Sequence, residues 1–323
     1  MKPKNTYSPF NNLISRQLNL LDFNFKKSVK NDIEKFENRS KEDLNENKLI
    51  NFIIHANDYA KSCLKKYSHY FSKHLYSQSS LFTILSLKIY LKLTYREISN
   101  LIDLSDKLKK FLHIKRAPHF TTLQKFFKRL PTKVLNKINQ SILTKNNIKP
   151  EIIVLDGSGF TNDHADKYYA QIRNQKRKSY IKNHIAIDVK SRLILNSQTQ
   201  KGPKYDTQFA IASIRKTKMY KPKYILADRA YDTEPIRKCI NEEIGAFDQI
   251  PLKKRAKKGK YRLNSPAIFR HRIYRKRNNV ECVFSVIKRL FNGINQSKST
   301  KLSNKETKLK NTIYNIHRST QIN

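Results

Sequence analysis

Residues 152–157 read Ile-Ile-Val-Leu-Asp-Gly, and residues 224–232 read Tyr-Ile-Leu-Ala-Asp-Arg-Ala-Tyr-Asp. In both stretches a short apolar run, typical of a buried strand, ends in an aspartate. A single aspartate at such a place is most simply a turn-forming residue that closes the strand. Two of them favour another interpretation, because a carboxylate at the end of a buried strand needs a compensating cation or metal ion. Asp156 and Asp228 are therefore candidate metal ligands.

The segments around these stretches alternate between strand-like and helix-like patterns. Further strands are expected at 180–189, 193–195 and 247–252, and helices at 206–216, 233–244 and 274–291. Three early strands followed by alternating helices and strands predict an α/β fold. We expect one mixed sheet of five strands with helices on its faces.

A third carboxylate is isolated in a strongly basic part of the chain. Glu281 is the single acid between Asp248 and Glu306, and residues 251–280 hold twelve Lys or Arg. The residues Tyr274, Arg277, Glu281 and Lys288 follow at offsets that fall within about 60° on one face of a helix. The adjoining face is apolar, with Val280, Val283, Phe284, Ile287, Leu290 and Phe291. One helix is thus predicted to pack on the core and to present Glu281, flanked by cations, to a partner.

The composition indicates nucleic acid as that partner. The formal net charge is +42 over 323 residues, which attracts polyanions and gains from counterion release at phosphates. A ribosomal or nucleoid packing protein would share this charge, but the long aromatic-rich periodic segments speak against it. No apolar run approaches the roughly 20 residues of a membrane span, so we expect no membrane partner.

Cysteine usage fits a reducing compartment. Cys63, Cys239 and Cys282 lie far apart and form no Cys-x-x-Cys pair, so neither a disulfide framework nor a zinc site is indicated. The chain also opens without the pattern of a signal peptide. We expect a cytoplasmic protein associated with the nucleoid.

Four regions are expected along the chain. Residues 1–75 are a helical, partly ordered segment, and residues 76–149 contain short helices with tight polar turns, typical of a helix-turn-helix-like region that binds DNA or mediates dimerisation. Residues 150–295 form the catalytic domain and residues 296–323 a helical tail. Whether region 76–149 contacts DNA or only packs stays open, although three cations near its last helix favour phosphate contact: Lys125, Lys128 and Arg129.

The motifs together resemble a known family. Asp156-Gly, then Asp228-Arg-Ala-Tyr-Asp232, then Tyr274-x2-Arg277-x3-Glu281-x6-Lys288 are similar to the motifs of DDE transposases of bacterial and archaeal insertion sequences. The four-residue signature is specific, whereas the Asp-Gly pair is not. The resemblance, which runs from Ile152 to Phe291, implies an RNase H-like domain. It also implies metal-dependent strand cleavage and strand transfer at the terminal inverted repeats of the element.

The resemblance also implies roles for individual residues. Asp156, Asp228 and Glu281 would hold two Mg²⁺ ions, for which Mn²⁺ can substitute, and two such ions clamp a phosphodiester. The expected DNA contacts are Tyr274, Arg277 and Lys288, together with the basic neighbours Arg229, Lys276 and Arg289. A simple ion pair between Arg277 and Glu281, four residues apart on a helix, is the alternative.

Other acids compete for these roles. Asp232 is the main rival of Asp228, which is preferred because it directly ends the apolar strand. Asp188 and Asp206 are expected to cap elements or to support the site from outside. His184 lies on the strand of Asp188, where a structural role is favoured over contact with the site.

Two other functions remain open beside a transposase. One is a nuclease of the same fold that cuts DNA without joining it to a second duplex. The other is a non-catalytic DNA-binding protein, such as a decayed transposase. A transposase must cut both element ends in one complex, so double-stranded DNA and a second copy of the chain are the expected partners.

Overall fold

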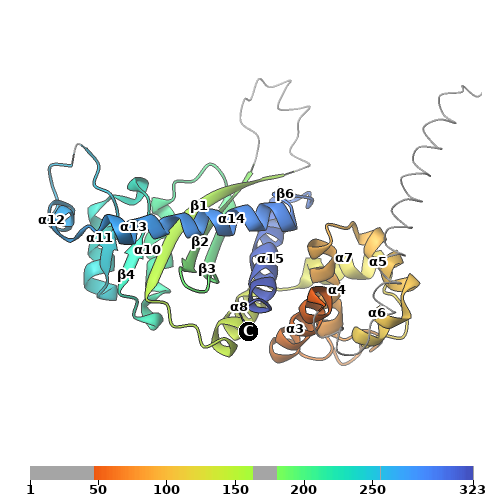
Figure 1. Cartoon of the computed structure of the whole chain (residues 1–323). Helices are drawn as coiled ribbons and strands as arrows, with labels where there is room; N and C mark the ends of the chain where they lie inside the picture. Colours follow the sequence, from red (N-terminus) through yellow and green to blue (C-terminus); the bar gives the residue numbers. More distant parts are fainter. Residues whose placement is uncertain (1–46, 163–179, 255, 323) are drawn as a thin grey trace, which may run out of the picture.

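The structure, a computed structural model, describes residues 47–162, 180–254 and 256–322 (Figure 1). Of the expected N-terminal segment, residues 1–46 lie outside these ranges. Helices come first along the chain, and a mixed sheet with helices on both faces follows. No helix in the described ranges is both long and apolar enough to cross a bilayer.

The N-terminal part is entirely helical. Its helices are α3 (Lys48–Cys63), α4 (Gln78–Tyr90), α5 (Tyr95–Leu104), α6 (Asp106–Phe111), α7 (Phe120–Arg129) and α8 (Thr132–Lys145). Helix α5 begins with a capping box. The Thr94 hydroxyl accepts from the Glu97 N–H, and the Glu97 carboxylate accepts from the Thr94 N–H. Helix α4 is buried around almost its whole circumference, and the hydroxyls of Thr83 and Ser86 are satisfied by carbonyls one turn earlier in the helix.

The sheet contains the five expected strands. They are β1 (Ile152–Asn162), β2 (Tyr180–Asp188), β3 (Ile194–Lys201), β4 (Tyr224–Leu226) and β5 (Phe247–Gln249), in the order β3-β2-β1-β4-β5. Strand β2 is antiparallel to β1 and β3, while β4 is parallel to both β1 and β5. This is the RNase H-like arrangement. A sixth strand, β6 (Ile294–Asn295), pairs with the far end of β1; it was not predicted, because two residues carry no periodicity.

Helices cover both faces of the sheet. Alternate residues of β1 belong to two separate apolar clusters: Ile152, Val154 and Phe160 face one side, and Ile153 and Leu155 the other. Helices α14 (Asn278–Phe291) and α15 (Thr300–Ser319) cover the first side, and α10 (Thr207–Arg215) and α11 (Glu234–Lys238) the second. Figure 1 shows α14 crossing β1. The two sides of β1 therefore have different polar neighbours.

Helix α15 joins the helical part to the sheet. The side-chain amides of Asn311 and Asn183 on β2 bond to each other, and the Asn315 side chain bonds to the backbone of Ile194 on β3. The Lys305 ammonium donates to two carbonyls at the end of α7. These buried polar contacts hold α15 in one register against the sheet.

The expectation of one continuous helix through the four-residue signature is wrong in its first turns. The backbone runs as α13 (His271–Tyr274), a 3-10 turn η4 (Arg275–Arg277), and then α14. A 3-10 turn has fewer residues per turn than an α-helix, so Tyr274 does not keep the offset of an ideal helix face. The predicted apolar face of α14 is confirmed, with Val280, Val283, Phe284, Ile287 and Phe291 buried and Leu290 partly buried.

Candidate active site

Asp156 on β1 and Asp228, two residues beyond the end of β4, occupy matching positions on neighbouring parallel segments. Val154 on β1 is paired with Leu226 on β4, and each aspartate lies two residues further along its own strand direction. Side chains two residues apart point to the same face, so both carboxylates lie on the face covered by α14. The sequence predicted each aspartate at a strand end. For Asp156 this is wrong, because β1 continues to Asn162 and Asp156 lies within it, paired with Ile185 on β2. Asp228 does follow the end of β4, and the parallel pairing of β1 with β4 brings the two aspartates together.

Backbone donors hold both carboxylates in place. Oδ1 of Asp156 accepts from the N–H of Gly157 at 2.8 Å, and Oδ1 of Asp228 accepts from the N–H of Ala230 at 2.8 Å. The second bond begins the short 3-10 helix η2 (Arg229–Tyr231) directly after β4. Each aspartate thus keeps its other oxygen for a further partner.

Asp156 is buried without full compensation. Burial raises the pKa of its carboxyl to about 6, and the negative charge of Asp228 acts in the same direction, whereas the Gly157 N–H and Arg277 oppose the rise. A carboxylate in this position favours a second cation beside it. Perturbed acids of this kind are typical of functional sites.

Arg277 lies between Asp156 of the sheet and Glu281 of helix α14. Its guanidinium is 3.8 Å from Oδ2 of Asp156 and also forms an ion pair with Glu281, four residues along the chain. The alternative of an ion pair on the helix is therefore present in the structure. The Glu281 side chain is half exposed, whereas those of Asp156 and Arg277 are each 20% exposed, so Arg277 serves the more buried carboxylate as well.

The donor set suits a hard divalent cation in part. Asp156 and Asp228 offer neighbouring carboxylate oxygens, the ligands that Mg²⁺ prefers. Within residues 47–162, 180–254 and 256–322, no group of three or more His, Cys, Asp or Glu is placed to hold a metal ion together. Glu281 bonds to Arg277 instead. The three-acid site thus stays a prediction, which two of its members fit by position.

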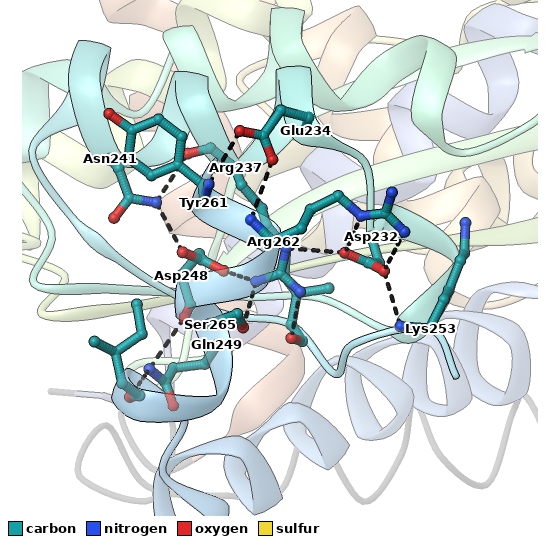
Figure 2. Close-up of polar contacts among 12 residues, drawn as sticks. Asp232, Glu234, Arg237, Asn241, Asp248, Gln249, Lys253, Tyr261, Arg262 and Ser265 are labelled. Carbon is teal, nitrogen blue, oxygen red and sulfur yellow. Dashed lines mark hydrogen bonds and ion pairs between the residues drawn. The ribbon is translucent and has the colours of Figure 1, made fainter. Parts of the chain in front are cut away.

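Asp232, the rival of Asp228, belongs to a buried ion-pair network (Figure 2). Its oxygens accept from Arg237 at 2.9 Å, from Arg262 at 3.2 and 3.1 Å, and from the N–H of Lys253 at 2.8 Å. Asp232 is 1% exposed and Arg237 0%. Arg237 also pairs with Asp248 and donates to Ser265 at 2.7 Å. With its oxygens bonded in this way, Asp232 has a structural role.

The same network anchors part of the basic run. Glu234 accepts from the N–H groups of Tyr261 and Arg262 at the start of α12 (Lys260–Ile268), as Figure 2 shows. Arg262, one of the twelve cations between 251 and 280, points into this network. Sequence reasoning missed it, because the arginines that pair inward have no local pattern that separates them from those that face solvent.

The expected DNA contacts lie around the same face. Lys288 on α14 donates to the hydroxyl of Ser158 at 2.8 Å, and its ammonium lies 5.5 Å from the centre of the Phe160 ring. Burial lowers the pKa of Lys288. The ring of partly buried Tyr274 lies 5.3 Å from that of Phe269. The other three predicted contacts, Arg229, Lys276 and Arg289, are exposed.

The remaining acids divide into two kinds. Asp188 accepts from the N–H of Lys190 and from both the N–H and the hydroxyl of Ser191, so it closes the turn after β2, as expected. The Asp206 side chain makes no capping bond to α10 and instead pairs with Lys182 at 2.8 Å. His184 is fully buried, and burial lowers its pKa to about 3, so its ring is neutral at physiological pH.

A sheet of this order, with Asp156 within β1 and Asp228 just after β4, is that of an RNase H-like enzyme of the transposase and nuclease class. The transposase DDE domain family matches residues 147–316, more than half of the chain. The chain therefore belongs to that family, as its motifs indicated. None of the curated proteins matches it.

Proposed function

We propose that the chain is a DNA transposase that binds the terminal inverted repeats of an insertion sequence and catalyses strand cleavage and strand transfer. The observation that carries this is the placement of Asp156 on β1 and of Asp228 just after the parallel strand β4, beneath the helix that bears Glu281. Membership of the transposase DDE domain family supports the reaction class. The net charge of +42 supports DNA as the substrate.

In this proposal Asp156, Asp228 and Glu281 hold two Mg²⁺ ions. Such ions, when bound, activate the attacking water or 3′-hydroxyl and stabilise the leaving oxygen. The chain positions the acids from three elements: β1, the turn after β4, and α14. Glu281 is half exposed and forms an ion pair with Arg277, so it must leave this pair to join the two aspartates.

Arg277 has two successive partners in the proposed reaction. While it lies beside Asp156 and Glu281, it supplies the positive charge that the acids need. With a divalent cation held by the acids, this guanidinium would be free to bind a DNA phosphate, a ligand that matches its fork of donors. Lys288 and Tyr274 add a point charge and a ring for a base on the same face.

The test is a cleavage assay on a duplex that carries the inverted repeat flanking the gene. We expect cutting with Mg²⁺ or Mn²⁺ and none with EDTA. Asp228→Asn removes the proposed ligand at constant size and should abolish cutting. The matched control is Asp103→Asn, an exposed aspartate of α5. Undiminished cleavage by Asp228→Asn would show that the proposed site is wrong.

Two further arms separate the rival functions. Transfer of a cut 3′ end to a second duplex identifies a transposase, whereas cutting without joining identifies a nuclease. DNA binding without any metal-dependent product identifies a binding protein. We also propose that a dimer of the chain assembles on the two element ends, which crosslinking on paired-end DNA would detect. The protein is further proposed to associate with the nucleoid.

A further inference from the structure

A second carboxylate reaches β1 beside Asp156, from the opposite face of the sheet. Asp206, which precedes α10, places its Oδ1 against Gly157, where a Cβ would lie only 1.9 Å from that oxygen. The Asp206 carboxylate therefore occupies space that any larger residue at 157 would fill. Glycine permits this close approach one residue along the chain from the proposed ligand Asp156.

Of the two carboxylate oxygens of Asp206, Oδ2 has a partner and Oδ1 has none among the described residues. The Lys182 ammonium lies 2.8 Å from Oδ2, and both side chains are largely buried, with exposed fractions of 15% for Lys182 and 20% for Asp206. Oδ1, the oxygen at Gly157, is buried and has no hydrogen-bond partner in the described part of the chain. A buried charged oxygen without a hydrogen-bond donor lowers the stability of the folded chain, so a donor from a bound ligand or water is expected at Oδ1.

Two buried polar side chains beside Asp206 also lack partners. His184 is paired with Gly157 across β1 and β2, and the ring of Tyr231 lies 5.9 Å from the His184 ring. Both residues are 0% exposed. Neither the ring nitrogens of His184 nor the hydroxyl of Tyr231 has a hydrogen-bond partner among the described residues. Unpaired buried polar atoms in one place indicate a site for a polar ligand such as bound water.

The Tyr231 phenol lies near Asp206 and also near Asp156 and Asp228. Burial raises the pKa of Tyr231, and the charges of Asp206, Asp156 and Asp228 add to the rise, in that order. The phenol therefore stays protonated and lies within the field of all three carboxylates. The Asp206 carboxylate and the pair on the other face thus share one electrostatic environment.

We propose that Asp206 is a positioning residue for the divalent cation that Asp156 and Asp228 bind, because its free Oδ1 accepts a hydrogen bond from one of the cation's water ligands. This inference rests on the proposed function. Mg²⁺ keeps several water ligands in protein sites, and each needs an acceptor. Lys182 fixes the other oxygen of Asp206, and Gly157 leaves the path to the site clear.

The alternative is that Asp206 serves only as the ion-pair partner of Lys182. That role predicts equal consequences when either member of the pair is neutralised, and no effect on metal affinity. The positioning role predicts unequal consequences. In Asp206→Asn the remaining oxygen faces the Lys182 ammonium, so an NH2 donor replaces the acceptor Oδ1 at Gly157. Lys182→Met instead removes a competing positive charge.

The experiment is a titration of the full chain with Mn²⁺, in which the electron paramagnetic resonance signal of free Mn²⁺ gives the affinity. We expect Asp206→Asn to weaken binding by about 10- to 100-fold, the usual loss when a group that orients metal ligands is removed. Gly157→Ala should weaken it similarly, because its methyl group displaces Oδ1. Lys182→Met should bind as tightly as the wild type or more tightly.

The matched control for Gly157→Ala is Gly159→Ala in the same strand, where the new methyl group meets the Tyr180 ring at 3.2 Å and no carboxylate. Thermal unfolding of each variant establishes that it is folded. Wild-type affinity in Asp206→Asn would overturn the inference, as would equal weakening in Asp206→Asn and Lys182→Met. Asp228→Asn separates the two proposals: if it also binds Mn²⁺ like the wild type, the metal site of the proposed function fails.

Discussion

Arg277 lies 3.8 Å from Asp156, across the boundary between the sheet and the helix that covers it. The same guanidinium pairs with Glu281. A cation of the protein thus stands where the proposed reaction requires metal ions, and the two compete for the same carboxylates. The proposed function therefore predicts that metal affinity and DNA affinity are coupled through this single side chain.

Replacing Arg277 should change these two affinities in opposite directions. In Arg277→Gln we expect Mn²⁺ to bind about tenfold more tightly, which corresponds to about 1.4 kcal/mol for the loss of one nearby, partly screened charge. Binding of inverted-repeat DNA should weaken, because a fork of phosphate donors is lost. The control is Arg275→Gln, which removes an exposed cation from the same 3-10 turn. Equal metal affinities in the two variants would contradict the prediction.

The buried network around Arg237 predicts a large loss of stability in Asp232→Asn. The substitution removes the carboxylate charge that lies 2.9 Å from the Arg237 guanidinium, and the Arg237 side chain is 0% exposed. Breaking a buried pair in this way lowers the free energy of unfolding by about 3–5 kcal/mol. Urea unfolding followed by circular dichroism measures the loss. Asp103→Asn, at an exposed position, should stay within about 0.5 kcal/mol of the wild type.

The lowered pKa of Asp232 predicts how the free energy of unfolding depends on pH. Burial alone would raise the pKa of Asp232, but its bonds to Arg262, the Lys253 N–H and Arg237 lower it overall. The stabilisation is therefore complete above the ordinary Asp pKa of about 4 and is lost as the pH falls further, because the unfolded chain then binds the proton more readily.

Unfolding free energies between pH 6 and pH 3 test this dependence. The wild type should lose stability below about pH 4, and Asp232→Asn should show a shallower slope. Some slope remains in the variant, because the pKa of Glu306 is also lowered: burial raises it, and Lys310 and hydrogen bonds lower it more. Identical slopes in both proteins would exclude Asp232 as a source of acid sensitivity.

Lys288 is predicted to contact a DNA phosphate beside the acids. Its ammonium donates to Ser158 on β1, so it is held on the face of the proposed site. If it contacts a phosphate, Lys288→Met should reduce the slope of log affinity against log salt by about 0.9. Lys301→Met removes the same charge from an exposed position on α15 and should leave the slope unchanged. Fluorescence anisotropy with an inverted-repeat duplex at several salt concentrations measures both.

Much of the fold followed from local patterns. The five main strands were predictable because short apolar or alternating runs, with turn residues around them, indicate strands locally. The continuation of β1 through residues 156–162 was not predicted, because it depends on pairing with β2. Helix α14 was predictable because five of its apolar residues share one face. Strand β6 and the 3-10 turn before α14 were not, because each depends on contacts with neighbours that are distant in sequence.

The candidate site was partly predictable for the same reason. Asp156 and Asp228 could be chosen because each directly follows a short apolar run, a property of a few consecutive residues. The choice between Asp228 and Asp232 rested on that single criterion. The structure supplies a second one, since Asp232 is bonded to two arginines from other elements. Nothing in the local sequence marks Arg237 and Arg262 as its partners.

The sequence by itself determined most of the strands and helices, and the apolar runs that precede Asp156 and Asp228, because these depend on the pattern of neighbouring side chains. Only the tertiary structure decided which of the acids meet. The parallel pairing of β1 with β4 brings Asp156 beside Asp228 across 72 positions of the chain (156 to 228). The same packing places Asp206 against Gly157 and Arg277 against Asp156. Electrostatic and hydrogen-bond energies depend on distances in space, and the folded chain alone sets those distances.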